Sequence, residues 1–293
     1  MAVYTIENEL AAAKINTHGA ELVSFVIKET QKEYMWNADE QYWKRTSPIL
    51  FPFVGAVNQG TYTHKGETYP MPKHGFARDM EFDLNFKEDT EICFQITETE
   101  ETKKVYPFEF VLMIGYELKG TELFVKWTVR NESAEEMFFS IGGHPAFMCP
   151  INAGEKQTDC TLRFDKKEGF VYGLVNEEGL LERDSNYLTL NNGELPIDVN
   201  LFDEDALIIE NNQVHGVAIA DSSRKSYVTV KFEAPLLGIW SPAKKQAPFI
   251  CIEPWYGRCD RFDFTGELSE REWGNALAPG AEFRAEYSIT VHA

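Results

Sequence analysis

The sequence of 293 residues predicts an all-β protein that forms one domain over residues 1–293, with few short helices. Two observations predict this fold class. Short stretches that alternate polar and apolar residues are separated by clusters of Gly, Asn, Asp and Pro, a pattern typical of sandwiches and barrels. Helical signals are few, and no linker, low-complexity tract or repeat of fixed period divides the chain.

Five stretches carry the strand pattern most clearly. In one of them Leu123, Val125, Trp127 and Val129 share one face, as expected for a half-buried strand. The predicted strands are residues 20–27, 91–98, 121–131, 226–232 and 282–291.

Three shorter elements complete the prediction. Residues 61–69 alternate around Lys65-Gly66, which predicts a β-hairpin with these two residues in the turn. Residues 39–45 are compatible with a short helix, and 269–272 form a capping-box pattern that predicts a helix of about two turns. Neither helix could organise a doubly wound sheet, which needs a helix between successive strands.

The composition excludes several classes of function. A hydrophobic share of 43% is ample for a core, and a net charge of −19 argues against binding nucleic acid or an anionic membrane surface. No apolar run approaches the length of a membrane span, and the N-terminus already has a strand pattern in place of a signal peptide.

The cysteines indicate the compartment. The chain has five, an odd number, scattered without a CxxC pair. This usage predicts free thiols in a reducing cytoplasm and makes a zinc site unexpected. The cysteines are Cys93, Cys149, Cys160, Cys251 and Cys259.

The first candidate for chemistry is His74. Pro70 and Pro72 stiffen the approach to it, and Gly75 permits a backbone geometry that other residues resist. A histidine held this firmly suits binding or proton transfer. The alternative is a turn histidine whose ring is satisfied by the backbone.

The second candidate is His144, which follows Gly142 and Gly143 at the end of a predicted strand. The glycines would let a ligand or another backbone approach closely, and Pro145 holds His144 in extended geometry. The alternative is a β-bulge with a structural histidine.

The third candidate is Glu253, predicted at the end of a buried strand and directly before Pro254. Burial would raise the pKa of this carboxylate, which suits a general base working near neutral pH. The alternative is a carboxylate that accepts bonds from loop amides. Aromatic residues, including Trp255, flank the three segments and could stack on sugar rings. Each of them taken alone is more typical of a hydrophobic core.

Other signals are weaker. The remaining histidines His18, His64, His215 and His292 are predicted at the surface. No metal-ligand spacing is present, nor an HExxH, EF-hand, P-loop or GxSxG motif, so neither a metal nor a cofactor is expected.

Taken together and in this order, four motifs resemble the aldose 1-epimerase (mutarotase) superfamily, most closely its LacX-like branch. They are Pro48-Ile-Leu-Phe-Pro52, His74-Gly-Phe-Ala-Arg78, Gly142-Gly-His-Pro-Ala-Phe147 and Cys251-Ile-Glu-Pro-Trp-Tyr-Gly257. The resemblance implies a galactose-mutarotase-like β-supersandwich and metal-free interconversion of the α and β anomers of an aldose.

The resemblance also implies roles for individual residues. His144 corresponds to the general acid, Glu253 to the general base, and His74 to the histidine that binds and polarises the ring oxygen. Asp205 corresponds to a sugar-binding carboxylate, with Asp203 close enough to leave the choice open. For an acid at His144, the charge of Glu253 is expected to raise the pKa of the imidazole.

The chain departs from the family pattern at one position. Relatives carry an arginine after Phe-Val-Gly, where this chain has Ala56. Arg78, Arg258 or Lys73 are candidates to replace it. Arg78, Arg258 and Arg261 are candidates for a phosphate contact. The substrate is therefore left open between a free sugar and a sugar phosphate.

The rival function is a non-catalytic sugar-binding or regulatory protein on the same fold. A hydrolase or lyase would need a second catalytic carboxylate or a tyrosine base, and the sequence offers no strong candidate. A homodimer remains open.

Overall fold

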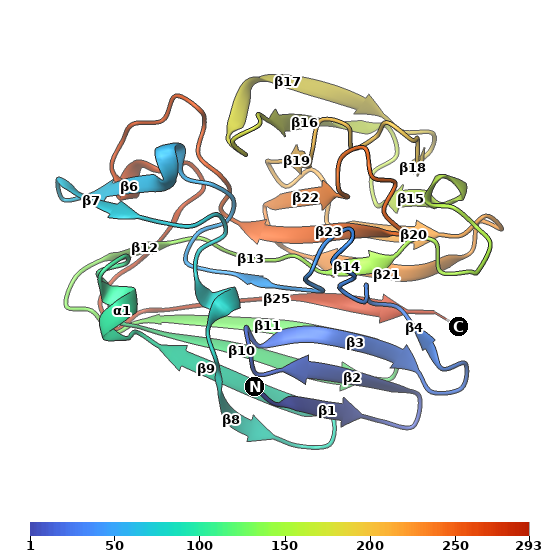
Figure 1. Cartoon of the computed structure of the whole chain (residues 1–293), viewed down its shortest axis with the longest axis horizontal. Coiled ribbons are helices and arrows are strands. Elements are labelled where there is room, and N and C mark those ends of the chain that lie inside the picture. The colour runs from blue at the N-terminus through green and yellow to red at the C-terminus, as the bar shows by residue number, and fades with distance from the viewer. Residues whose placement is uncertain (293) are drawn as a thin grey trace.

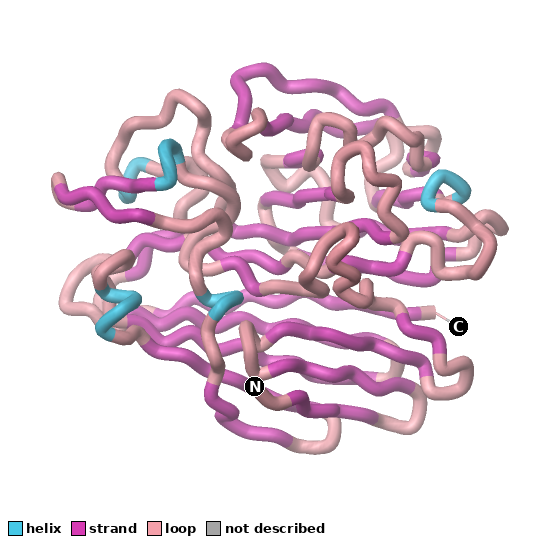
Figure 2. The backbone as a smooth tube through the Cα atoms, viewed as in Figure 1, coloured by secondary structure: helices cyan, strands magenta, loops and turns pink. Residues whose placement is uncertain are grey.

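A computed structural model, which describes residues 1–292, consists almost entirely of β-strands (Figures 1 and 2). The largest sheet has nine strands in the order β18-β15-β20-β21-β25-β11-β10-β9-β8. Its strands are β8 (Asp83–Lys87), β9 (Glu91–Thr97), β10 (Phe110–Lys119), β11 (Glu122–Asn131), β15 (Thr161–Phe164), β18 (Glu194–Pro196), β20 (Gly216–Ala220), β21 (Ser226–Phe232) and β25 (Glu282–Val291).

The second sheet has eight strands and carries the candidate residues. Its order is β17-β16-β19-β22-β23-β13-β5, and β14 also pairs with β23. The strands are β5 (Ile49–Leu50), β13 (Ile141–Gly143), β14 (Ala146–Met148), β16 (Gly169–Val175), β17 (Leu181–Thr189), β19 (Leu207–Ile209), β22 (Leu236–Trp240) and β23 (Phe249–Tyr256).

Smaller elements surround these two sheets. A four-stranded sheet contains β1 (Val3–Glu7), β2 (Ala11–Asn16), β3 (Glu21–Ile27) and β4 (Lys32–Glu33), and two-stranded sheets join β6 (Thr61–His64) to β7 (Glu67–Pro70) and β12 (Met137–Phe139) to β24 (Asn275–Leu277). The helical turns are η1 (Asn58–Gly60), η2 (Ala77–Asp79), η3 (Gln157–Asp159) and η4 (Leu268–Glu270), with one α-helix, α1 (Glu100–Lys103). None of the helices in residues 1–292 is long and apolar enough to cross a bilayer.

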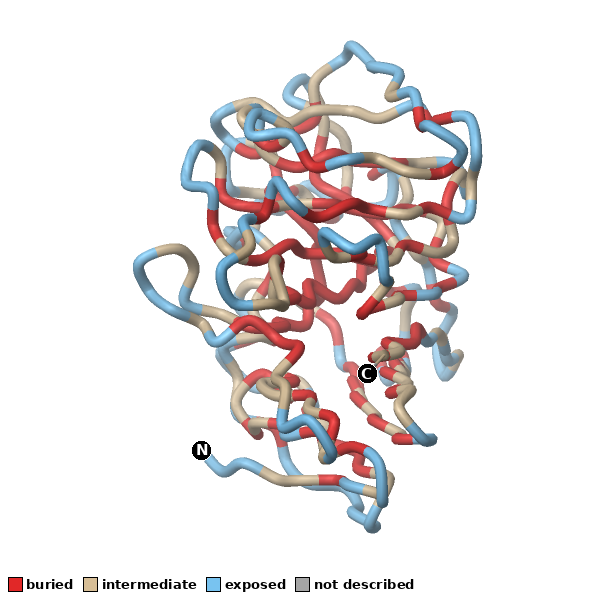
Figure 3. Tube along the Cα trace, turned by 90° about the vertical axis from the view of Figure 1, so that its right-hand side faces the viewer, coloured by how far each residue is buried: buried red, intermediate tan, exposed pale blue. Residues whose placement is uncertain are grey.

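The main core lies where the two large sheets face each other. The β16–β19–β22–β23 layer and the β25–β11–β10–β9–β8 layer occupy different halves of the molecule, and the buried residues run through its interior (Figures 1 and 3). Side chains from both sheets, such as Trp127 of β11 and Ile250 and Ile252 of β23, belong to one buried cluster. Since side chains alternate along a strand, the odd-numbered residues of β23 face away from this core.

The predicted strands agree closely with the structure. β21 and β25 have the predicted bounds, and β3, β9 and β11 differ by one residue. The hairpin β6–β7 turns at Lys65-Gly66, where both residues have positive φ as a two-residue type I′ turn requires. The all-β prediction is therefore confirmed.

The helix predictions fail in informative ways. Residues 39–45 form a turn, because the Asp39 side chain accepts the Gln41 N–H and the Asp39 carbonyl accepts the Tyr42 and Trp43 amides. The predicted helix at 269–272 is only the single turn η4, which starts one residue earlier. The prediction for His64 is also wrong, since its ring is buried against Phe108.

Candidate active site

A cavity of about 210 Å³ lies over the outward face of β23. At about 30 Å³ per water, it holds about seven waters, the scale of one sugar ring. Six of the seven residues predicted for the site line it, namely His74, Arg78, His144, Asp205, Glu253 and Trp255. Asp203 does not line it.

Glu253 lies in the middle of β23, opposite Gly238 of β22. The prediction that it ends the strand is wrong, because Pro254 continues the strand and pairs with Leu237. Cys251, Glu253 and Trp255 alternate along the strand and so share the face turned away from the main core. Glu253 is only 1% exposed, so its carboxylate is held in a fixed position at the cavity floor.

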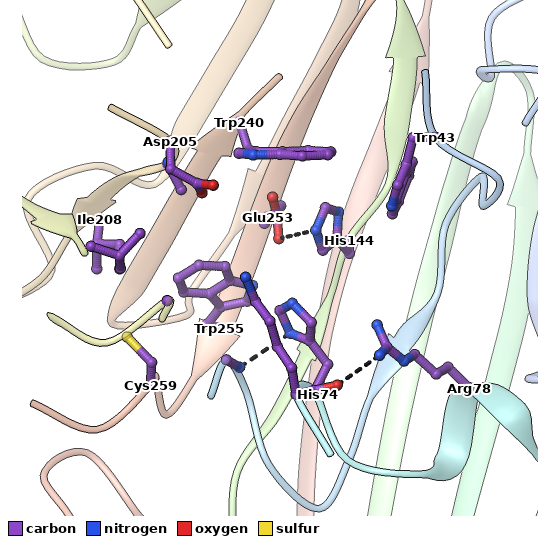
Figure 4. Close-up of a pocket in the computed structure, with 15 residues that line it drawn as sticks. Trp43, His74, Arg78, His144, Asp205, Ile208, Trp240, Glu253, Trp255 and Cys259 are labelled. Atoms are coloured by element: carbon purple, nitrogen blue, oxygen red, sulfur yellow. Dashed lines mark hydrogen bonds and ion pairs between the residues drawn. The ribbon is translucent and has the colours of Figure 1, made fainter. Parts of the chain in front are cut away.

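His144 follows β13 and is 7% exposed. Its backbone N–H donates to the Pro48 carbonyl at 3.2 Å. Its Nε2 atom lies 3.3 Å from the Oε2 atom of Glu253 (Figure 4). Within residues 1–292, Glu253 Oε2 and the other ring nitrogen of His144, Nδ1, are both buried without a hydrogen-bond partner.

The sequence predicted that the glycines before His144 let a ligand or another backbone approach, but in the structure they make room for side chains. A Cβ atom on Gly142 would lie 2.5 Å from Cδ1 of Trp255. On Gly143 it would lie 2.9 Å from the hydroxyl of Tyr287. Gly142 and Gly143 therefore let Trp255 and Tyr287 pack directly on the strand that presents His144.

His74 has a left-handed backbone, with φ of 70°, and is followed by Gly75 with φ of 69°. A side chain at position 75 would put its Cβ 2.2 Å from the Phe51 carbonyl oxygen. The Gly55 N–H donates to His74 Nδ1 at 3.1 Å, so Nδ1 is an acceptor and Nε2 carries the proton. His74 is therefore a neutral hydrogen-bond donor, in keeping with a pKa held well below the usual range by burial and by His144.

Burial dominates the titration of the Glu253–His144 pair. It raises the pKa of Glu253 well above its usual value and lowers the pKa of His144 to about 3. The expectation that Glu253 raises the pKa of His144 is therefore wrong, because loss of water around the imidazole outweighs the nearby carboxylate. Burial thus favours the neutral form of each residue, and the two titrate as a coupled pair.

Aromatic rings fix the orientation of His144. Trp43 stacks on it with ring centroids 4.7 Å apart, and Trp240 packs edge-on at 5.5 Å (Figure 4). His74 completes the frame, with its ring edge-on at 5.6 Å. Trp43 and Trp240 were noted in the sequence only as aromatics near the candidate segments, since the turn at 39–45 meets β22 and His144 only in three dimensions.

Comparisons with known proteins identify the family of the chain. Residues 2–290 match the sequence profile of the aldose 1-epimerase family. The chain belongs to the aldose 1-epimerase family. Protein LacX of Lactococcus lactis subsp. lactis is 30% identical over 98% of both chains.

Two solved structures from this family are similar over nearly the whole length. A galactose mutarotase related enzyme from Lactobacillus acidophilus is 36% identical, with a TM-score of 0.95 over 100% of this chain and 98% of that chain. A galactose mutarotase-like protein from Lactobacillus casei is 32% identical, with a TM-score of 0.93 over 99% of this chain and 100% of that chain. The mutarotase-like fold implied by the resemblance is thereby confirmed.

Two arginines that the sequence offered for the family's sugar-binding or phosphate role are engaged elsewhere. Arg258 is 2% exposed and donates to Glu210 at 2.6 Å and to Glu272. Arg261 donates to the same Glu272 at 3.0 Å. Neither residue lines the cavity, so both arginines tie the segment after β23 to its surroundings.

Arg78 lines the cavity but is also part of the support for His74. Its guanidinium donates to the Lys73 carbonyl at 2.7 Å (Figure 4). It also lies 3.7 Å from Asp79. Burial and the nearby Arg45 lower its pKa to about 10. Its Nε atom is the one that lies near Asp79, where it is buried and makes no hydrogen bond in the described residues.

Of the two acidic residues left open by the sequence, Asp205 is the one at the cavity. It has φ of 68°, and its Oδ1 accepts the Ala206 N–H at 2.8 Å. This local bond fixes the carboxylate while Oδ2 stays available to a sugar hydroxyl.

One group of donor atoms in residues 1–292 has the proximity for a metal ion. The ligand atoms of His144, Cys251 and Glu253 lie within 4.8 Å of one another. Metal binding needs the thiolate, and burial together with Glu253 raises the pKa of Cys251 well above its usual value. The chemistry of this trio therefore fits proton transfer better than metal coordination.

Proposed function

We propose that this chain is an aldose 1-epimerase that interconverts the α and β anomers of a hexose by opening and reclosing the ring. The observation that carries the proposal is the contact of His144 Nε2 with Glu253 Oε2 at 3.3 Å, at the floor of a cavity for one sugar ring. Ring opening needs one group to take the proton of the C1 hydroxyl and another to protonate the ring oxygen. Two buried groups sharing one proton meet this need.

In this proposal Glu253 takes the C1 hydroxyl proton and His144 gives a proton to the ring oxygen. The C1–O5 bond breaks, the aldehyde forms, the C1–C2 bond turns, and the reverse transfers close the ring on the other face. Before the step Glu253 is ionised and His144 protonated; after it the proton is on Glu253. The pair therefore holds one proton throughout.

The charged form of the pair needs support, because burial opposes it on both residues. The Trp255 side chain and Lys73 both favour ionised Glu253, since each lowers its pKa against the larger effect of burial, but Lys73 also lowers the pKa of His144 and so disfavours its protonated form. His74 donates from Nε2, which suits a contact with the ring oxygen or a neighbouring hydroxyl.

The environment of the pair also suits a sugar. Trp255 and Trp240 offer flat apolar faces, while Asp205 and Arg78 offer hydrogen-bonding groups on the same cavity. A few polar groups among apolar walls are typical of small-molecule sites. The five free cysteines, all buried, support the expectation of a reducing, cytoplasmic compartment.

The experiment is a mutarotation assay by polarimetry or by NMR exchange at the anomeric protons. Glucose, galactose and their 6-phosphates form the panel, and a reaction without protein gives the solution rate. We expect acceleration of at least one sugar. No acceleration with any of them, together with measurable sugar binding, would favour the non-catalytic sugar-binding protein.

A further inference from the structure

Lys73 is the cation of the cavity with no partner of its own. Its side chain lines the cavity, and its ammonium makes no hydrogen bond or ion pair within residues 1–292. A Cβ atom on Gly179 would lie 3.1 Å from Lys73 Nζ and 3.8 Å from the methyl group of Ala56. The ammonium therefore lies beside Ala56, the position at which relatives carry an arginine.

The backbone holds this lysine firmly. The Lys73 carbonyl accepts from Arg78 at 2.7 Å, the next residue donates its N–H to Gly55 at 2.8 Å, and Gly75 donates to Pro72 at 2.9 Å. Lys73 thus enters the cavity from the same fixed segment as His74. The Lys73 side chain itself is exposed, so binding has to order this side chain but not the backbone that carries it.

The neighbouring cations already have partners. Arg45 donates to Asp79 at 2.7 Å, and Arg78 is bound to the Lys73 carbonyl and lies beside the same Asp79. Arg258 and Arg261 are bound to carboxylates outside the cavity. Among the described residues, Lys73 is the cavity cation whose whole charge is available to a ligand.

The charge of Lys73 reaches the cavity floor. It lowers the pKa values of His74, His144 and Glu253. For each of the three residues, burial has a larger effect on the pKa than Lys73 has. The protein as a whole carries a net charge of −19, so an uncompensated cation facing a cavity is an exception. An anion on the ligand would complete this arrangement.

We propose that Lys73 binds an anionic group, a phosphate or a carboxylate, carried by the sugar on a carbon remote from C1. The cavity then selects anionic aldoses over neutral ones. This inference rests on the proposed function for the position of the sugar ring. An ammonium bonds phosphate and carboxylate oxygens as a compact charge, and such a contact is expected to be worth about tenfold or more in affinity.

The test measures binding separately from turnover. Calorimetry compares 1,5-anhydroglucitol with its 6-phosphate, and the corresponding galacto compounds, at low and moderate salt. These sugars lack the anomeric hydroxyl and cannot react. We expect the parent to bind a phosphate at least tenfold more tightly than the neutral sugar, with the difference shrinking as salt rises.

Three variants locate the effect. Lys73→Met should bind the neutral and the phosphorylated sugar about equally, whereas Lys73→Arg should keep the preference for the phosphorylated sugar. The control is Lys167→Met, which removes a positive charge from an exposed position outside the cavity. It should behave as the parent. Methyl glucuronide supplies a carboxylate in place of the phosphate. Tighter binding of either anion, lost in Lys73→Met, supports the inference and identifies the anion.

Two results would overturn it: a parent that does not discriminate, or a preference that survives in Lys73→Met. The outcome is independent of the assay for mutarotation. A protein that discriminates through Lys73 but accelerates no sugar would remove the proposed activity and leave the anion site standing. A protein that accelerates mutarotation but binds neutral and anionic sugars equally well would support the proposed activity and remove the anion site.

Discussion

His144 Nε2 and Glu253 Oε2 lie 3.3 Å apart in a setting where both residues are almost fully buried. β13 presents the histidine and the adjacent β23 presents the carboxylate. Burial drives their pKa values in opposite directions, so that the neutral form of each is favoured. The pair must therefore be treated as one titrating unit with a single proton between the two residues.

The first prediction concerns the pH profile of the parent. With the pKa of His144 at about 3 and that of Glu253 raised, the one-proton form spans a wide range. We expect kcat/KM to keep its plateau down to about pH 4 and to fall on the acid side only near pH 3, while the alkaline limb follows the raised pKa of Glu253. Independent groups with ordinary pKa values near 4.3 and 6.5 would instead give a narrow bell, falling about tenfold per unit above pH 6.5. A narrow bell would contradict the account.

The second prediction concerns His144. His144→Asn removes the group that protonates the ring oxygen, so kcat should fall by about 10²-fold or more. The residual activity should rise with pH and lose its alkaline limb, because only the ionisation of Glu253 remains. His215→Asn, outside the cavity, is the control and should stay within about twofold of the parent. An unchanged alkaline limb in His144→Asn would assign the acid role to another group.

The third prediction concerns the stability of Glu253→Gln. The folded-state pKa of Glu253 lies above its unfolded value, so above about pH 4.5 the unfolded chain releases a proton that the folded chain keeps. This group therefore destabilises the parent increasingly as pH rises towards the folded pKa, by about 1.4 kcal/mol for each unit of the shift. Gln does not titrate, so Tm of the variant relative to the parent should increase from pH 5 to pH 8. A difference in Tm that is constant with pH would show that the carboxylate is not desolvated as described.

The fourth prediction concerns the space beside β13. Gly142→Ala places its Cβ 2.5 Å from Trp255 and 3.2 Å from the Pro254 carbonyl oxygen. We expect a loss of about 1–3 kcal/mol in stability from overpacking and a displaced Trp255 with reduced kcat/KM. The matched control is Gly115→Ala in β10, whose nearest contact is an ordinary 3.5 Å. Equal Tm and activity for the two variants would rule out this packing role.

Alternation in the sequence predicted most of the strand scaffold. In β11, for example, buried residues alternate with mostly half-buried ones, and the bounds of the strand follow from this local pattern. Glu253 was harder to place, because a following proline is typical of a strand end, yet Pro254 lies within β23. The sequence shows which residues precede and follow Glu253. It does not show that β22 and β13 lie on either side of the strand that carries Glu253.

The candidate site was predictable where a motif carried it and not where it depends on contacts between distant segments. His74, His144 and Glu253 lie in motifs that resemble a family, and the fold brings them together. Lys73 beside Gly179, by contrast, depends on a loop that meets it only in three dimensions. The low pKa of His144 also could not be read from the sequence, because it depends on burial by Trp43 and Trp240.

The central claim is that Glu253 is the proton acceptor of ring opening. The measurement is NMR exchange at the anomeric protons, on the sugar that the parent turns over fastest, for the parent and Glu253→Gln, with binding of the unreactive 1,5-anhydro analogue measured in parallel. Gln keeps the shape and hydrogen bonding of the side chain but cannot take a proton. The account predicts a fall in kcat of at least about 10²-fold with analogue affinity within about threefold of the parent. Turnover near that of the parent would contradict it.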